Sequence, residues 1–429
     1  MTRALDVLVD GKLIGHLYDK DPLAFVYSDD VLNGLLRSPF SSVIALAPGD
    51  IATPAVLAYF ENLLPEGDQR RTLEEKHHAT SVFGLLWSAG WDTVGAIVLQ
   101  PSGSDSNIPA YVKSSWTEIA QIIAGHGVPR ESSKASISGA QYKLLLCLDG
   151  QANPLLPVGS TPSTHILKPD IERTGQKIWA SAINETIIMR AAGKCGLPIA
   201  NVDYVAAVKS CLVERYDRLA RNGVVIRVHQ SDLCQLLNTV SGVKYEVDGG
   251  PSFAACYARV KSLSANPLID CANLLKWLFF NLYVGNNDSH AKNVSMLSTS
   301  DGERLAPFYD LMTTTVYPGF STHFAFSIGG TFKPGEIGPG ELKDLADSLN
   351  VSEKYMLKLA KEMADLINPA IEASILELQA HLGHPEKTMA ERLSHEVASI
   401  CKKRSARFLA RSASPFPDVG STAKDKRVS

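Results

Sequence analysis

The chain has 429 residues, of which 45% are hydrophobic and 20% are charged, a composition typical of a globular protein with two or three packed units. The net charge of −3 excludes a strongly basic surface over the whole molecule, so contact with nucleic acid would need a local patch. The seven cysteines include no pair with CxxC spacing, which favours buried reduced thiols over disulfide bonds or a zinc site.

Two segments bear on the location of the protein. Asp6 and Asp10 interrupt the apolar residues near the N-terminus, so no signal peptide is expected. Residues 268–285 form the most apolar run, but Asp270 and Lys276 leave fewer than the roughly 20 uninterrupted apolar residues that a membrane span needs. We therefore expect a buried helix there, no membrane contact and a cytoplasmic location.

The first 100 residues predict a small α+β unit. Two apolar segments, 4–9 and 13–18, flank Asp10-Gly11, which is a strong signal for a two-residue hairpin turn. Residues 52–67 follow with a helical pattern, and residues 92–101 have the composition of a strand. Residues 101–216 predict a β-rich unit, with further strands around Asp149-Gly150, at 163–168 and at 202–216, and a helix at 176–196.

Helical patterns dominate after Asp217. They cover residues 268–284, 351–382 and 389–413, and Pro369 predicts a break in the second of these. The tail 413–429 has no apolar periodicity and is expected to be disordered. This order predicts an α+β protein with two lobes, a hinge near Tyr216 and a ligand cleft between the lobes.

A polar stretch follows the apolar helix directly and reads VGNNDSHAKNVSM. Asp288 and Asn293 lie in it, five residues apart, and a hairpin turn at Asp301-Gly302 would bring Asn293 close to Asp310. Converging carboxylates and a carboxamide suit Mg²⁺ bound together with phosphates, and an aspartate placed like Asp288 can accept a hydroxyl proton, as in kinases. The alternative is a solvated loop with capping Asn and Asp side chains, but the matched position of Asp310 favours the functional interpretation.

Other parts of an ATP site follow the same order as in kinases. Residues 138–143, SGAQYK, could cover phosphates, but Gly139 is their only glycine, and taken alone the segment fits a plain turn better. Lys168 ends a predicted strand ahead of a helix with Glu185, which fits a lysine on ATP phosphates steadied by a carboxylate. The main chain of residues 214–216 could receive the adenine edge at the hinge, the alternative being a surface ion pair between Glu214 and Arg215.

As a set, these motifs resemble a known family. SISGAQYK, THILK, VERYDR, DLCQ, VKYEVDGGP, NDSHAKN and PFYD resemble, in this order, the motifs of HipA, the serine/threonine kinase toxin of HipA–HipB toxin–antitoxin modules. The resemblance covers residues 5–410. It implies a bilobal, atypical protein-kinase-like fold with a HipA-type N-terminal subdomain at 1–100, a kinase N-lobe at 101–216 and a helical C-lobe at 217–412. VKYEVDGGP has no function in this interpretation beyond forming a loop.

The resemblance also implies roles for single residues. Asp288 would be the catalytic base, Asn293 and Asp310 would bind Mg²⁺, and Ser136 would be an inactivating autophosphorylation site, with Ser138 as a rival. The residues expected to bind ATP are Ser138, Gly139, Ala140, Gln141, Tyr142, Lys143, Lys168, Glu214, Arg215, Tyr216, His290, Ala291, Lys292, Asn293, Tyr309 and Asp310. The chain lacks the G-x-G-x-x-G, H-R-D and D-F-G motifs of eukaryotic protein kinases.

The expected partners are a HipB-like helix-turn-helix antitoxin, operator DNA reached through that antitoxin, and a protein substrate such as an aminoacyl-tRNA synthetase. Two alternatives remain at the level of sequence. One is a small-molecule phosphotransferase with the same base and metal ligands. The other is a weakly catalytic corepressor that acts through a DNA-binding antitoxin, for which the basic segment 401–411 is the best support.

Overall fold

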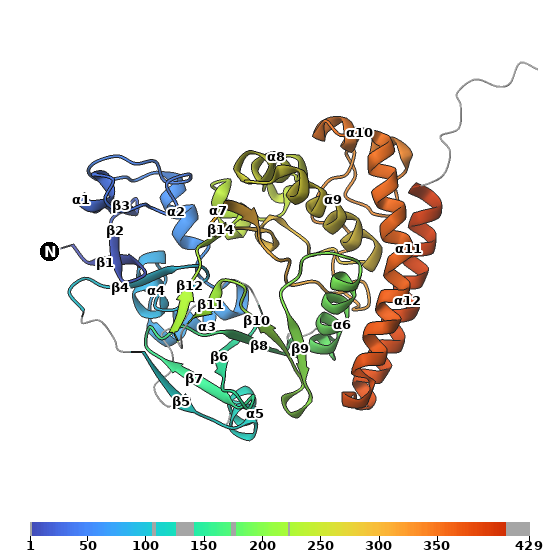
Figure 1. The fold of residues 1–429 in the computed structure, drawn as a ribbon, viewed down its shortest axis with the longest axis horizontal. Helices are drawn as coiled ribbons and strands as arrows, with labels where there is room; N and C mark the ends of the chain where they lie inside the picture. Colours follow the sequence, from blue (N-terminus) through green and yellow to red (C-terminus); the bar gives the residue numbers. More distant parts are fainter. Residues whose placement is uncertain (1, 105–108, 126–140, 173–176, 222–223, 409–429) are drawn as a thin grey trace, which may run out of the picture.

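The computed structural model describes most of the chain in five stretches, namely residues 2–104, 109–125, 141–172, 177–221 and 224–408. Figure 1 shows an N-terminal unit, drawn in blue, beside a larger body in which green strands lie next to a stack of yellow to red helices. The predicted sites Ser136, Ser138, Gly139 and Ala140 and the predicted tail 413–429 lie outside the described residues.

The N-terminal unit contains an antiparallel sheet and its own hydrophobic core. The strands follow the order β3 (Ala24–Tyr27), β2 (Lys12–Tyr18), β1 (Ala4–Val9) and β4 (Ile97–Pro101). The predicted first hairpin is confirmed, because Val9 pairs with Lys12 and both Asp10 and Gly11 have positive φ.

Helices α1 (Asp29–Leu32), α2 (Pro54–Glu61), α3 (Gly67–His77) and α4 (Val82–Ala89) complete the N-terminal unit. The helix predicted through residue 67 ends earlier than expected, at Glu61. Asn62 caps it there, with its side-chain amide donating to Ala58 O at 2.7 Å and to Thr239 O at 2.8 Å. The helix end therefore faces the C-terminal half of the chain.

The middle of the chain forms a six-stranded antiparallel sheet. Its order is β5 (Ala110–Lys113), β7 (Pro154–Val158), β6 (Leu144–Leu148), β8 (His165–Pro169), β10 (Ser210–Glu214) and β9 (Val202–Val205). Helix α5 (Trp116–Ile123) covers a small core beneath the sheet. Helix α6 (Ser181–Lys194) instead packs within the large core of the helical part. That core therefore extends across the hinge predicted at Tyr216.

The helical part contains α7 (Leu233–Leu236), α8 (Phe253–Leu263), α9 (Pro267–Val284), α10 (Pro339–Leu349), α11 (Glu353–Leu378) and α12 (His384–Phe408). The break predicted at Pro369 is wrong, because Pro369 lies inside the single helix α11. Contacts with α6, α9 and α12 along α11 compensate for the hydrogen bond that a proline removes. Within the described residues, no helix is both long and apolar enough to cross a bilayer.

The expectation that helices dominate after Asp217 is confirmed, but strands that were not predicted come first. A hairpin of β11 (Arg218–Arg221) and β12 (Val224–Arg227) comes first, and β13 (Gln230–Asp232) then pairs with β14 (Ser295–Thr299), which pairs with β15 (Gly302–Leu305). The predicted hairpin after the polar stretch is present, but Thr299 pairs with Gly302, so its turn lies one residue earlier, at Ser300-Asp301. Thr299 fixes this turn by donating its hydroxyl to Gly302 O at 2.7 Å.

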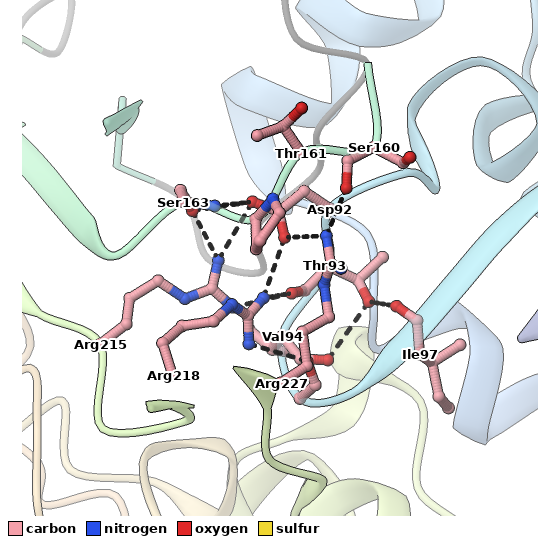
Figure 2. Close-up of polar contacts among 12 residues, drawn as sticks. Asp92, Thr93, Val94, Ile97, Ser160, Thr161, Ser163, Arg215, Arg218 and Arg227 are labelled. Carbon is pink, nitrogen blue, oxygen red and sulfur yellow. Dashed lines mark hydrogen bonds and ion pairs between the residues drawn. The ribbon is translucent and has the colours of Figure 1, made fainter. Parts of the chain in front are cut away.

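A buried charge network joins the N-terminal unit to the hinge (Figure 2). Asp92 precedes β4, and its carboxylate meets three guanidinium groups, at 2.9 Å for Arg218, 3.2 Å for Arg227 and 3.5 Å for Arg215. It also accepts the Ser163 hydroxyl at 2.7 Å and the Ser163 amide at 3.0 Å. The side chains of Asp92, Arg215 and Arg218 are each at most 2% exposed.

Asp217 adds a second carboxylate to this network. It binds Arg215 at 2.9 Å and Arg218 at 3.0 Å, and it accepts the amide of Gly95 at 2.7 Å. Burial alone would raise the pKa of Asp92 and Asp217, but the guanidinium groups outweigh burial and hold both pKa values below the ordinary range. The surface ion pair considered for Arg215 is therefore wrong, because its guanidinium lies in this buried network.

We predict that Asp92→Ala lowers the free energy of unfolding by about 3–5 kcal/mol, because it leaves buried guanidinium groups without their carboxylate. Denaturant titration measures the change, with Asp19→Ala as the control. Asp19 pairs with Arg3 on the surface, and its loss should cost about 1 kcal/mol or less. The pKa of Asp92 is lower in the folded protein than in the unfolded chain. Its ionised carboxylate therefore stabilises the fold above the ordinary carboxyl pKa, and this stabilisation is lost as the pH falls through the pKa of the folded state. Equal losses in the two variants would contradict a special role for the network.

Candidate active site

A cavity of about 710 Å³ opens between the N-terminal unit, the six-stranded sheet and the helical part. The predicted cleft between two lobes is present, and the N-terminal unit adds a third wall with Glu66, Asp68, Gln69 and Val94. The predicted site residues that line it are Gln141, Tyr142, Lys143, Lys168, Glu214, Arg215, Tyr216, Asp288, His290, Lys292, Asn293, Tyr309 and Asp310. The structure thus brings together residues separated by more than 160 positions in the chain.

The polar stretch after α9 is partly structural. Helix α9 ends at Gly285, which has a φ of +71° and leaves no room for a side chain, since a Cβ would lie 2.5 Å from Thr315 Oγ1. Asn286 then donates its side-chain amide to Asn281 at 2.7 Å, and Asn287 donates its side-chain amide to Ser321 O at 2.8 Å. These buried amides shape the loop that presents Asp288.

Asp288 and Asn293 lie at the two ends of this loop. The Asp288 side chain is 52% exposed in the cavity, and its main-chain oxygen accepts the side-chain amide of Asn293 at 3.0 Å. That bond leaves the Oδ1 atom of Asn293 to other ligands. Burial raises the pKa of Asp288. The positive charge of Lys244 and the hydrogen bond from the Tyr245 hydroxyl oppose this rise without cancelling it.

Lys168 connects the sheet to both sides of the cleft. Its ammonium lies 2.5 Å from Glu185 Oε1 on α6 and 2.8 Å from Asp310 Oδ1 (Asp310 has a φ of +59°). Burial by itself would lower the pKa of Lys168, but the two carboxylates outweigh it and raise that pKa. Burial likewise opposes ionisation of Asp310, yet Lys168 and Lys143 hold its pKa well below the ordinary value. The predicted pairing of Lys168 with Glu185 is confirmed.

Other predicted residues have structural partners. The Lys292 ammonium binds Asn62 O at 2.9 Å, Asn62 Oδ1 at 2.6 Å and Asp232 at 3.2 Å, so it ties the loop to the N-terminal unit. The Tyr309 hydroxyl donates to Lys292 O at 2.8 Å. Ala291 is fully buried in the core and does not line the cavity.

Two main-chain amides of the hinge are already hydrogen-bonded within the protein, so only part of the hinge main chain can bind a ligand. The amide of Glu214 donates to Asn201 O at 2.9 Å, and that of Arg215 donates to Thr164 O at 2.9 Å. An adenine base would therefore meet the carbonyl of Glu214 or the main chain of Tyr216, which these bonds do not occupy. Apolar side chains for its faces are present on the cavity wall, at Ile166, Val213 and Met312.

The sheet edge of the cavity carries a second lysine. Gln141 donates its side-chain amide to Pro169 O at 2.9 Å, close to the end of β8. Burial, together with the nearby charge of Lys168, lowers the pKa of Lys143 to about 8. Lys143 and Lys168 thus place two amino groups on this side of the cavity, where the charge of Lys168 is balanced by Glu185 and Asp310.

The donor set fits a magnesium ion that takes its remaining ligands from water and phosphates. Asp310 supplies an ionised carboxylate that is 40% exposed in the cavity, and Asn293 supplies an amide oxygen. Among the described residues, no cluster of three or more His, Cys, Asp or Glu side chains is placed to hold a metal. Two oxygen ligands suit Mg²⁺, which usually keeps waters and takes its other ligands from phosphates.

The sequence did not reveal Glu66, Lys244 or Tyr245 as site residues. Lys244 pairs with Glu66 at 2.5 Å, and the Tyr245 hydroxyl donates to Asp288. Lys244 and Tyr245 belong to the VKYEVDGGP motif, which was the one available signal. Nothing in the spacing of Glu66 indicates a contact 178 positions away.

These parts define a class of protein. Protein-kinase-like phosphotransferases have a strand lysine paired with a helix glutamate. They also have a loop with Asp and Asn five residues apart and a further Asp on the same cavity. The structure contains each of these parts. The family model of the HipA-like C-terminal domain matches residues 135–371, and that of the HipA N-terminal domain matches residues 5–100. The chain belongs to the HipA family of serine/threonine kinase toxins, as its motifs predicted.

Individual relatives agree with this assignment. The chain is 31% identical over 395 residues to the putative kinase Y4mE of Sinorhizobium fredii, covering 87% of this chain and 92% of that protein. It is 30% identical over 386 residues to the serine/threonine-protein kinase toxin HipA of Shewanella oneidensis, covering 85% and 87%. HipA in the solved Shewanella oneidensis complex of HipA, HipB and operator DNA matches with a TM-score of 0.79 and 28% identity, over 94% of this chain and 97% of that one. The predicted bilobal kinase-like α+β fold is therefore confirmed.

We predict that Lys168→Met destabilises the protein by about 3–5 kcal/mol, because Glu185 is left buried without its counter-charge. The double variant Lys168→Met/Glu185→Leu should recover most of this stability, since apolar side chains can replace a buried ion pair. Denaturant titration measures both changes in the free energy of unfolding. The control is Lys194→Met, which removes a more exposed ion pair with Glu377.

Calorimetry with Mg-ADP should show weak binding in both Lys168 variants. Wild-type ADP affinity in the restored double variant would refute a role for Lys168 in nucleotide binding.

Proposed function

We propose that this protein is a Mg²⁺- and ATP-dependent serine/threonine protein kinase that acts as the toxin of a toxin–antitoxin module. The observation that carries the proposal is the convergence of Lys168, Asp288, Asn293 and Asp310 on one cavity. Its volume of about 710 Å³ lies within the range of small-molecule and cofactor pockets, and the amino groups of Lys143 and Lys168 on its wall could contact phosphates. The serine/threonine-protein kinase toxin HipA of Shewanella oneidensis, as a relative, favours this interpretation over a small-molecule phosphotransferase.

Each proposed role follows from where the group lies. Asp288 would accept the proton of a serine or threonine hydroxyl, because its carboxylate is half exposed in the cavity and its loop is fixed by buried amides. Lys168 would contact phosphates, being held at the cavity wall by Glu185. Asn293 and Asp310 would hold Mg²⁺, which when bound neutralises charge on the phosphate oxygens. The remaining cavity residues would orient the nucleotide.

The proposed substrate and partners rest on the family. A protein substrate such as an aminoacyl-tRNA synthetase and a HipB-like antitoxin are expected, with operator DNA reached through the antitoxin in the cytoplasm. The relative from Shewanella oneidensis was solved with HipB and operator DNA, which supports the partner proposal. The basic segment at the end of α12 gives little added support for a corepressor role. Burial lowers the pKa of Arg404 to about 10, and Arg407 donates to Glu336 O at 2.8 Å.

Asp288→Asn and Asp310→Asn should each reduce phosphoryl transfer from Mg-ATP by about 10²-fold or more while the fold is retained. The first change removes the proton acceptor, and the second weakens the proposed Mg²⁺ site. Radiolabelled transfer to protein and growth on induced expression measure the effect, and melting temperature reports on the fold. Asp344→Asn, on an exposed face of α10, is the matched control. Transfer at the wild-type rate in either site variant would remove that residue from the proposal.

Ser136 should become phosphorylated when the protein is incubated with Mg-ATP, and the modified protein should lose nucleotide affinity. A phosphate adds about −1.5 to −2 charge a few positions before Gln141, Tyr142 and Lys143, which line the cavity. Mass spectrometry should find it in the wild type and not in Asp288→Asn, and Ser138 is the rival site. Ser136→Asp should weaken Mg-ADP binding, and Ser136→Ala should preserve it. A phosphorylated protein with higher activity would contradict this form of self-inactivation.

A further inference from the structure

The motif VKYEVDGGP, residues 243–251, lies against Asp288. The Tyr245 hydroxyl donates to Asp288 Oδ1, and the Tyr245 ring packs edge-on against His290 with ring centres 5.1 Å apart. The Lys244 ammonium lies 5.5 Å from the centre of the Tyr245 ring. Both Lys244 and Asp288 line the cavity. The motif therefore contributes to the active site and is more than a surface loop.

The backbone of the VKYEVDGGP motif is held in one conformation. Gly249 has a φ of +90°, and the amide of Gly250 donates back to Tyr245 O at 2.9 Å. A Cβ on Gly250 would lie 2.1 Å from Val243 O, so the turn requires glycine there. Glu246 anchors the motif from the other side by accepting the Ser327 amide at 2.9 Å. Lys244 and Tyr245 are thus presented from a fixed support.

The partner of Lys244 comes from the N-terminal unit. Glu66 lies just before α3, and its carboxylate pairs with Lys244 at 2.5 Å, with side chains 10% and 14% exposed. Glu61 and Asn62 fix the same edge of the unit, because Glu61 accepts the Ser241 amide at 2.9 Å and Asn62 accepts Lys292. Burial alone would lower the pKa of Lys244, but the carboxylates of Glu66 and Asp288 outweigh it and keep the ammonium charged.

We propose that Glu66, Lys244 and Tyr245 are positioning residues for Asp288, and that the N-terminal unit thereby completes the active site. The inference rests on the proposed role of Asp288 as the proton acceptor. Tyr245 fixes one carboxylate oxygen and leaves the other to the substrate hydroxyl. Lys244 supplies positive charge near the carboxylate, and its pairing with Glu66 keeps it from forming a close ion pair that would occupy Asp288.

The test is a double-mutant cycle on turnover of Mg-ATP, measured as phosphate release by the full-length protein. Lys244→Met and Glu66→Gln should each lower kcat by about tenfold or more, with KM for Mg-ATP changed less than about twofold, as expected for groups that act in the transition state. Because Glu66 acts through Lys244, the double variant should be no slower than Lys244→Met. Lys244→Arg should restore part of the rate.

Two further variants keep the inference testable if a charge change harms folding. Tyr245→Phe removes only the hydroxyl and should lower kcat with an unchanged melting temperature. Lys333→Met, which removes an exposed ion pair with Glu336, is the matched control and should leave kcat unchanged. The inference would be overturned if the effects of Lys244→Met and Glu66→Gln on kcat multiply in the double variant. It would also be overturned if Tyr245→Phe keeps the wild-type kcat, or if the variants change only KM. If the wild type shows neither phosphate release nor radiolabelled transfer to protein, the proposed kinase function fails instead.

Discussion

The placement of every part around the cleft depends on the buried network of Asp92, Asp217 and the guanidinium groups of Arg215, Arg218 and Arg227. Two carboxylates face three guanidinium groups, so the network is stable only while all its members and the Ser163 and Gly95 hydrogen bonds are in place. Because Arg215 belongs to the hinge and Asp92 to the N-terminal unit, the network fixes that unit against the strand that leads into the cleft. The third wall of the cavity follows from it.

Charge also organises the cleft itself. The Lys168 ammonium lies between Glu185 on α6 and Asp310 after β15, and Lys292 lies between Asp232 and Asn62. Lys168 therefore joins the sheet to the helical part, and Lys292 joins the polar loop after α9 to the N-terminal unit. The ammonium of Lys168, which joins the sheet to the helical part, also helps to hold the pKa of Asp310 below its ordinary value. Stability and the electrostatics of the site are therefore coupled.

Much of this was predictable from local sequence. Asp10-Gly11 encodes its hairpin, the apolar run at 268–284 encodes α9, and Asp288, Asn293 and Asp310 were found from their spacing. Interactions between distant segments could not be predicted in the same way. Pro369 remains helical only because neighbouring helices pack along α11, and Glu66 meets Lys244 only because the N-terminal unit docks on the helical part. Arg215 looked like a surface residue because its buried partner, Asp92, lies 123 positions earlier.

The third wall of the cavity has a consequence for selective inhibition. Glu66 lines the cavity, and its side chain is 10% exposed. A compound bound in the cavity that extends an amine toward this carboxylate would gain a charge-assisted contact with the N-terminal unit. This carboxylate comes from the N-terminal unit and not from the six-stranded sheet or the helical part. Selective binding to this protein can therefore be sought at Glu66, away from the hinge and from the lysines at the sheet edge of the cavity.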